Sequence, residues 1–139
     1  MGVFNHINWE PKFSVHVEEI DAQHRQLFAI ANEIMDIYEK DSADCYRIIE
    51  GLVEYVSVHF LTEQKVMMKT NYPDIKNHLQ QHDIFTEKIV EILRIYKEKE
   101  RKVSLDIVTF LTDWIYEHTI SMDLKYAEHL LKRGYKKIY

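Results

Sequence analysis

Residues 59–63 read HFLTE, in the middle of a segment whose other regularly spaced side chains are apolar. His59 and Glu63 are four residues apart, so on a helix they share one face. The apolar spacing directs that face toward the interior, where a glutamate is rarely found without a partner. Similar polar pairs recur in HLQQH at residues 78–82 and in HTISMD at residues 118–123. These stretches predict a buried polar site assembled from several helices.

Four segments have apolar residues spaced three and four apart, which is the pattern of amphipathic helices. We expect helices over residues 19–40, 43–69, 74–100 and 104–122. Their inward apolar residues are Ile20, Leu27, Ala31, Ile34 and Tyr38; Cys45, Leu52, Val56 and Val66; Ile75, Phe85, Ile89, Leu93 and Tyr96; and Leu105, Val108, Leu111 and Ile115. Long helices joined by short turns favour an all-α fold, an up-down-up-down antiparallel four-helix bundle.

Turn and cap residues separate the predicted helices. Asp41 or Ser42 is expected to cap the second helix, and Ser104 the fourth. Pro73 ends the second helix, because proline cannot continue a helix and disfavours helical backbone at the residue before it. We expect residues 1–17 to form an irregular arm that packs on the bundle. The aromatic residues of that arm are Phe4, Trp9 and Phe13.

The composition excludes several classes of protein. The chain has 139 residues, of which 46% are apolar and 29% charged, as expected for one soluble domain. Its net charge is -5 without a basic stripe, which argues against nucleic acid as a partner. The single cysteine, Cys45, excludes an internal disulfide and cysteine-based metal sites, and reads as a core thiol. With no signal peptide or membrane-spanning run visible, we expect a cytoplasmic protein.

The histidines of the four helices fall at compatible heights. The inward polar positions are His24 in the first helix, His59 and Glu63 in the second, His78 and His82 in the third, and His118 in the fourth. In an antiparallel bundle these positions lie at the same end. Asp123 fits less simply, because five residues rotate it by roughly 140° from His118 on a regular helix. It would reach inward only if the helix ends or loosens there.

A metal centre explains this set better than core packing does. Taken singly, an inward histidine is usually a hydrogen-bonded core residue. Taken together, so many buried polar groups would each cost about 1–3 kcal/mol if left unpaired. One zinc takes about four ligands, which is too few, and calcium or magnesium would prefer oxygen ligands. Imidazoles with a few carboxylates suit iron, copper or zinc, and carboxylates bridge two ions, so two irons is the natural count.

These residues resemble the hemerythrins, in particular the single-domain bacterial hemerythrins. The family pattern is a histidine on the first helix, HxxxE on the second, HxxxH on the third and HxxxxD on the fourth. The chain matches this pattern in order with DAQH, HFLTE, HLQQH and HTISMD. The resemblance covers residues 1–139 as one domain: an arm at 1–17, a bundle at 18–122 and a short helical tail at 123–139. It also selects Asp123, which geometry alone does not.

The resemblance implies a non-haem di-iron centre that is ferrous without oxygen and ferric with it, bridged by an oxide or hydroxide. His78, His82 and His118 would ligate one iron, and His24 and His59 the other, which keeps an open position. Glu63 and Asp123 would bridge the two ions. The ligand set, poor in carboxylates and without any Glu-x-x-His motif, favours binding over oxidation.

The implied function is reversible dioxygen binding, as a carrier, a store or a buffer. We expect a non-enzymatic monomer whose partners are dioxygen and an oxygen-consuming enzyme as recipient, with neither nucleic acid nor membrane. Weak oxidase or peroxidase activity stays open. The alternatives are oxygen or nitric oxide sensing, and redox or iron-handling activity at the same di-iron site.

Apolar neighbours of the predicted ligands would keep the site dry. This expected ligand pocket consists of Leu27, Phe28, Phe60, Trp114 and Ile115. Tyr116, two residues before His118, would offer a hydroxyl if it pointed inward, but we expect it at the surface. The remaining histidines match no ligand position and are predicted to be surface or arm residues. They are His6, His16 and His129.

Overall fold

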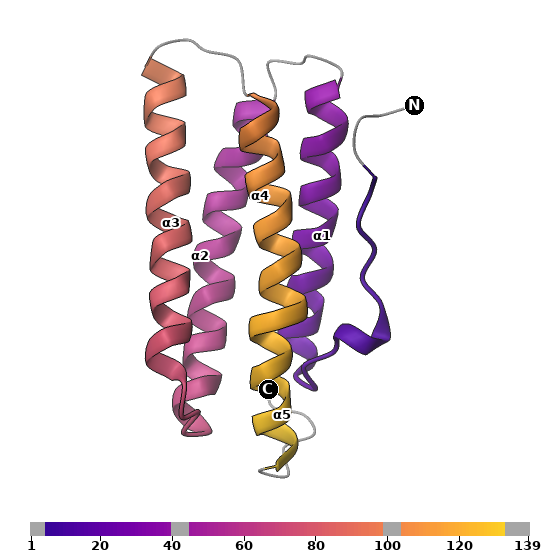
Figure 1. Ribbon diagram of the computed structural model, residues 1–139, viewed down its shortest axis with the longest axis vertical. Helices are drawn as coiled ribbons and strands as arrows, with labels where there is room; N and C mark the ends of the chain where they lie inside the picture. The colour runs from indigo at the N-terminus through magenta and orange to yellow at the C-terminus, as the bar shows by residue number, and fades with distance from the viewer. Residues whose placement is uncertain (1–4, 40–44, 99–103, 133–139) are drawn as a thin grey trace.

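The computed structural model describes residues 5–39, 45–98 and 104–132. Its elements are a 3-10 turn η1 (Pro11–Phe13), α1 (Glu18–Glu39), α2 (Cys45–Lys69), α3 (Ile75–Glu98), α4 (Leu105–Glu117), a π-helical turn η2 (His118–Met122) and α5 (Asp123–Lys132). Helices α1 to α4 run alternately up and down, and α5 continues α4 beyond the end of the bundle (Figure 1). The predicted all-α antiparallel bundle with an arm and a helical tail is confirmed.

The helix ends follow the local sequence. The hydroxyl oxygen of Ser104 accepts a hydrogen bond from the backbone N–H of Ile107 at 3.3 Å, so the predicted cap of α4 is confirmed. Between α2 and α3, Asn71 has a φ of 54°, a left-handed conformation that asparagine tolerates, shortly before Pro73. The predicted caps Asp41 and Ser42 lie outside the described residues.

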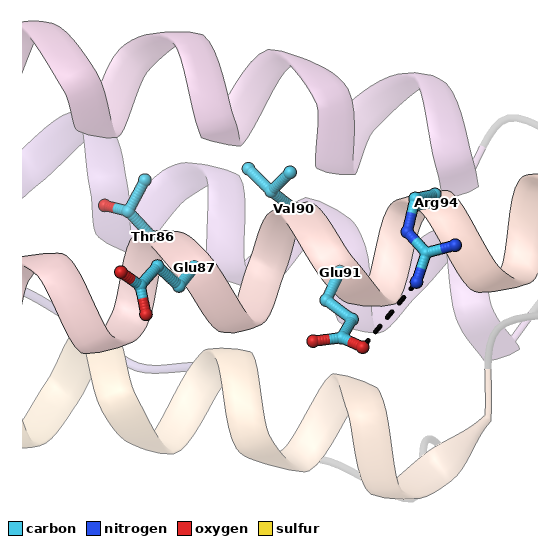
Figure 2. Close-up of a pocket in the computed structure, with 5 residues that line it drawn as sticks. All are labelled: Thr86, Glu87, Val90, Glu91 and Arg94. Carbon is cyan, nitrogen blue, oxygen red and sulfur yellow. Dashed lines mark ion pairs between the residues drawn. The ribbon is translucent and has the colours of Figure 1, made fainter.

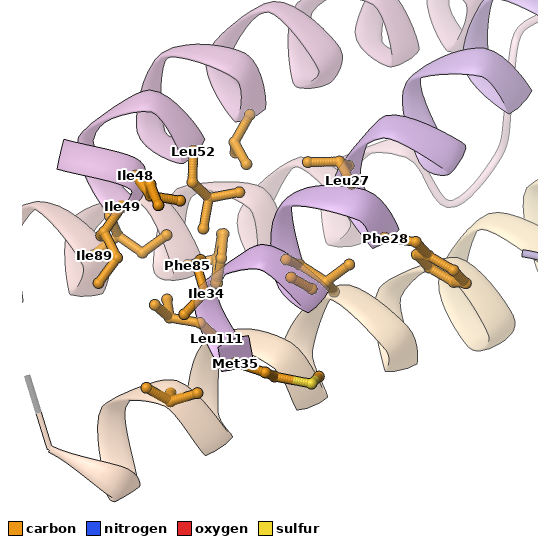
Figure 3. Packing of buried hydrophobic residues seen from close by; sticks show 14 of the residues in the cluster. Leu27, Phe28, Ile34, Met35, Ile48, Ile49, Leu52, Phe85, Ile89 and Leu111 are labelled. Carbon is orange, nitrogen blue, oxygen red and sulfur yellow. The ribbon is translucent and has the colours of Figure 1, made fainter. Parts of the chain in front are cut away.

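The main apolar core lies between the four long helices (Figure 3). Most of the predicted inward residues are buried in it, among them Leu27, Ile34, Leu52 and Phe85. Leu105 is the exception: its prediction as an inward residue is wrong, because it is 43% exposed at the first turn of α4. Tyr38, Ile75 and Leu93 are half-buried, and the side chains of Cys45 and Tyr96 lie outside the described residues.

The N-terminal arm runs beside α1 (Figure 1). Asn32 holds it with two hydrogen bonds of 2.8 Å, one to the N–H and one to the carbonyl of Ile7. Lower down, the buried carboxylate of Asp21 accepts a hydrogen bond of 2.8 Å from the N–H of Val15. Phe13 is buried and Trp9 half-buried against the core, as predicted. The predicted contact of Phe4 lies outside the described residues.

A second, smaller apolar cluster lies where α2 turns into α3 and α5 leaves the bundle. Its buried members are Val15, Val17, Ile20, Val66, Met67, Tyr72, Tyr126, Ala127 and Leu130. Along each long helix, the predicted site residues fall between this cluster and the main core. The fold therefore seals a polar layer between two apolar ones. No helix in the described part of the chain is long and apolar enough to span a membrane.

Candidate metal centre

The seven predicted site residues lie together near the end of the bundle where α1 begins and α2 ends. His24 comes from α1, His59 and Glu63 from α2, His78 and His82 from α3, His118 from η2, and Asp123 from the start of α5. Their exposure ranges from 0% to 3%. The helical spacing of four residues places each pair of α2 and α3 on one inward face. The expected convergence of all four helices is therefore observed.

Glu63 contacts the histidines of three elements. One of its oxygens, Oε1, lies 2.5 Å from His59 Nε2, 3.1 Å from His118 Nε2 and 3.7 Å from His82 Nε2. The other oxygen, Oε2, lies 3.3 Å from His78 Nε2. A carboxylate so placed can share its two oxygens between two cations.

Asp123 reaches the same cluster from the far side. Its Oδ2 lies 2.7 Å from His24 Nε2 and 2.9 Å from His118 Nε2, and its Oδ1 lies 3.0 Å from His78 Nε2. The π-helical turn makes this possible, because the N–H of Asp123 bonds to the carbonyl of His118 five residues earlier. One extra residue in the turn cancels the unfavourable rotation of a regular helix. From the sequence, Asp123 was expected to reach inward only if the helix ended or loosened there, and the π-helical turn is such a loosening.

The ligand atoms form two overlapping groups. One group contains His24, His59, Glu63, His118 and Asp123; the other contains Glu63, His78, His82 and His118. Within each group the candidate ligand atoms all lie within 4.8 Å of one another. Glu63 and His118 belong to both groups, so the two positions adjoin. This arrangement is fit for a metal site.

Unpaired polar atoms test that fit. Among the described residues, several buried nitrogens and oxygens of the cluster have no hydrogen-bond partner: both ring nitrogens of His24 and of His82, Nε2 of His59 and His78, Nδ1 of His118, Oε2 of Glu63, and both oxygens of Asp123. Desolvating such atoms without compensation is costly. Cations satisfy lone pairs of nitrogen and oxygen together, so the residues present fit a metal centre of mixed imidazole and carboxylate ligands.

Residues 15–130 match the family model described as hemerythrin HHE cation binding domain. The chain belongs to the hemerythrin family. It is 28% identical over 127 residues to a bacteriohemerythrin of Clostridium acetobutylicum, an alignment that covers 86% of this chain and 98% of the relative. It is 26% identical over 119 residues to a hemerythrin-like protein of Naegleria gruberi, covering 86% and 89%.

A solved hemerythrin structure has the same architecture. The wild-type hemerythrin crystal structure superposes with a TM-score of 0.81 at 25% identity, covering 91% of this chain and 98% of that one. The resemblance inferred from the motifs is thereby confirmed. All seven site residues fall within the span that matches the cation-binding model of the hemerythrins.

When no metal is bound, the two carboxylates of this hemerythrin site favour the protonated form of two of its histidines. Burial lowers the pKa of His78, but its close contacts with the carboxylates of Asp123 and Glu63 outweigh burial and raise it to about 9. For His118, burial is likewise outweighed by the charges of Asp123 and Glu63, which raise its pKa to about 10. Burial raises the pKa of each carboxyl group, yet neighbouring histidines hold both below their ordinary values.

Two other histidines of the site remain neutral. Burial lowers the pKa of His82 to about 3, and the charge of Glu63 recovers only part of that shift. Burial also lowers the pKa of His59. Neutral imidazoles and ionised carboxylates are the forms that bind metal ions, so His78 and His118 would each have to lose a proton to bind one.

Aromatic rings line the main-core side of the hemerythrin site. Phe60 stacks on His82 with ring centroids 3.6 Å apart, and Trp114 stacks on His118 at 4.6 Å. The other expected pocket residues, Leu27, Phe28 and Ile115, are buried in the apolar core next to the site. The structure thus surrounds one side of the cluster with apolar groups, which exclude water.

Tyr116 does not lie at the surface as expected. It is half-buried, and its ring centroid lies 6.2 Å from that of Phe13 and 6.2 Å from that of Phe28. At this place the N-terminal arm packs over α1 and α4 and partly covers Tyr116. The sequence alone did not predict this contact.

None of the remaining histidines joins the cluster. His6 is an exposed partner of Asp36 at 2.7 Å, and His16 lies half-buried in the arm. His129 on α5 is half-buried, and its Nε2 lies 2.8 Å from the carbonyl oxygen of Thr70. Gln23, a neighbour of the site, was not predicted, since no periodicity marks a residue beside an inward histidine.

Helix α3 borders hollows in the surface of the described part of the chain. The one in Figure 2 has a volume of about 370 Å³ and contains none of the cluster residues. Its lining is Thr86, Glu87, Val90, Glu91 and Arg94, with Arg94 and Glu91 paired at 3.7 Å. The other, of about 490 Å³ between α2 and α3, includes Phe60 and His82 in its lining, so here the cluster borders a surface pocket.

Proposed function

We propose that this hemerythrin-family chain binds dioxygen reversibly at a di-iron centre, as a carrier, store or buffer for oxygen-consuming enzymes. The observation that carries the proposal is the donor set: five imidazoles and only two carboxylates, all buried, in two adjoining groups. Carboxylate-rich sites stabilise oxidised iron and suit oxidases, whereas neutral imidazoles leave the ions more positive and favour the ferrous state. A site of this kind is suited to binding and release.

In the proposed centre, His78, His82 and His118 would hold one iron, and His24 and His59 would hold the other. Glu63 and Asp123 would be ligands shared by both. Six contacts support this assignment: Glu63 touches histidines of α2 and α3, Asp123 touches histidines of α1 and α3, and both touch His118. His24 and His59 supply only two imidazoles, which leaves their iron a free position for a ligand.

Two ferrous ions held by these residues would supply the electrons that dioxygen binding requires. The protein's part is to keep the site dry, so that the bound gas leaves as dioxygen. Phe60 and Trp114 stack on ligand histidines, and Leu27, Phe28 and Ile115 fill the space beyond them. These side chains form the proposed ligand pocket.

The test is a visible absorption spectrum of the iron-loaded protein, reduced without air, then exposed to air and degassed. We expect about two irons per chain and an absorption band that appears with air and fades on degassing. The zinc-loaded protein, which has no redox chemistry, should show no band. Immediate and irreversible conversion in air would overturn reversible binding and favour a sensing or redox role at the same site.

A further inference from the structure

A chain of hydrogen bonds runs from one candidate ligand, His59, back to the helix that carries it. His59 Nδ1 lies 2.7 Å from Gln23 Oε1 on α1. Gln23 Nε2 lies 3.1 Å from the hydroxyl oxygen of Thr62, and that hydroxyl lies 3.0 Å from the carbonyl oxygen of Val58. Gln23 is 9% exposed and His59 is fully buried, so water has little access to the bond between them, whereas the bond from Thr62 to Val58 lies at the surface.

The direction of every bond in this chain follows from its last member. The backbone carbonyl of Val58 can only accept, so the hydroxyl of Thr62 must donate its one hydrogen to it. The Thr62 oxygen is then left to accept from the amide N–H of Gln23. That fixes the amide with its carbonyl oxygen toward His59, and Nδ1 of His59 must therefore carry the hydrogen.

The consequence lies at the other ring nitrogen. A neutral imidazole has one N–H, so Nε2 of His59 presents a lone pair toward the cluster beside Glu63 Oε1, where two acceptors face each other and a metal cation would satisfy both. The outer nitrogens, Nδ1, of His24, His82 and His118 are buried without any hydrogen-bond partner among the described residues. His59 is thus oriented in a way that those three rings are not.

We propose that Gln23 is a positioning residue for the metal position of His24 and His59. Held by Thr62 and Val58, Gln23 fixes the tautomer and the ring orientation of His59. The proposal rests on the proposed metal centre. A hydrogen bond at the outer nitrogen also makes imidazole a stronger ligand, and losing such a partner typically weakens metal binding 10–100-fold. Because His59 belongs to only one of the two donor groups, the effect should fall on one ion.

The experiment compares Gln23→Leu and Gln23→Glu with the wild type, using zinc(II) as the probe in calorimetric titrations. Zinc requires no oxygen chemistry. We expect Gln23→Leu to bind one ion, at the position of His78 and His82, with wild-type affinity. The other ion, at the position of His24 and His59, should bind about 10–100-fold more weakly. Gln23→Glu should restore the second ion, since a carboxylate also accepts from Nδ1. The matched control is Gln26→Leu, an exposed residue of the same helix, which should change neither ion.

A second readout needs no metal. Long-range proton–nitrogen NMR spectra of the metal-free protein report the tautomer of His59, which we expect to be Nδ1–H in the wild type and mixed in Gln23→Leu. Wild-type zinc affinities and an unchanged tautomer in Gln23→Leu would overturn the proposal. If that variant does not fold, Thr62→Val tests the same chain, and a full-strength second ion with an unchanged tautomer there overturns it equally.

The two proposals fail in different ways. A wild-type chain that binds fewer than two zinc ions would contradict the di-iron centre. The tautomer of His59 in the metal-free protein would still show whether Gln23 orients the ring.

Discussion

Glu63 lies within 3.7 Å of four histidine nitrogens, more than Asp123 contacts. Replacing Glu63 by Ala would remove a shared ligand and leave Asp123 as the remaining carboxylate of the cluster, in contact with His78 and His118. We expect the variant to lose at least one of the two ions, measured as iron per chain, together with the oxygen-dependent spectrum. Glu54→Ala, an exposed change two turns earlier on α2, is the control. Wild-type iron content in Glu63→Ala would count heavily against the ligand assignment.

The two protonated histidines predict that metal binding releases protons. With pKa values of about 9 and 10, His78 and His118 carry protons at pH 7 that must leave before the rings bind metal. We expect zinc binding at pH 7 to release about two protons per chain and to become tighter as the pH rises. Titrations in buffers of different ionisation enthalpy measure this number. Release near zero would contradict the protonation pattern.

The same histidines give the metal-free protein a characteristic pH dependence. Their pKa values are raised above the ordinary 6.5, so their contribution to stability is complete below about pH 6.5 and is lost as the pH rises through 9 and 10. We therefore expect the unfolding free energy of the metal-free protein to fall across this alkaline range. Zinc-loaded protein should lack this loss, because the metal has replaced the protons. If the unfolding free energy fell equally at alkaline pH with and without zinc, these two histidines would not be the cause.

At the level of single residues, the sequence predicted six cluster members from helical spacing. Asp123 needed the family pattern, because a five-residue offset points it away on a regular helix. Gln23 was missed, since its role depends on which atoms of α2 lie opposite. Spacing shows which way a side chain faces, but a hydrogen-bond partner depends on the neighbouring helix.

The π-helical turn is the element that the site depends on most. Deleting exposed Ser121 from it would place the aspartate four residues after His118 instead of five, which is the spacing of one face of a regular α-helix. We expect this deletion to keep the pair on one face, so the protein should still fold and bind zinc. Circular dichroism and zinc titration would measure both properties.

A deletion in a regular helix should behave differently. Removing exposed Asp113 from α4 would rotate every later residue by roughly 100° relative to the residues before it. His118 and Trp114 would then leave their positions, and zinc binding should be lost. If both deletions reduced folding and zinc binding equally, the π-helical turn would not contain the extra residue that we infer.

Helix boundaries were largely predictable, and their errors have simple causes. The cap at Ser104 identified the start of α4 correctly, since its hydroxyl accepts from the first free N–H groups. Leu105 was placed inward although it lies at the edge of the apolar stripe, in a first turn with few neighbours. Apolar spacing locates the middle of a stripe better than its ends.

For the whole molecule, the polar layer between two apolar clusters predicts a large effect of metal on stability. At a free zinc concentration about 100 times the dissociation constant, binding adds about 2.7 kcal/mol to the folded state. For a chain of this size we expect the melting temperature to fall by roughly 10 °C when a chelator removes the metal. Differential scanning calorimetry tests this, with Glu63→Ala as a variant that should respond less. No change on chelation would show that the layer is stable without metal.

The sequence by itself determined the bundle, the polar layer near one end of it and the family, because helical periodicity and ligand spacing are local properties of the chain. The tertiary structure decided what depends on contacts between elements. It turned Asp123 inward through a π-helical turn, covered Tyr116 with the arm, and placed Gln23 of α1 against His59 of α2. These features follow from how separate helices pack, and spacing along one helix carries no record of the atoms on another.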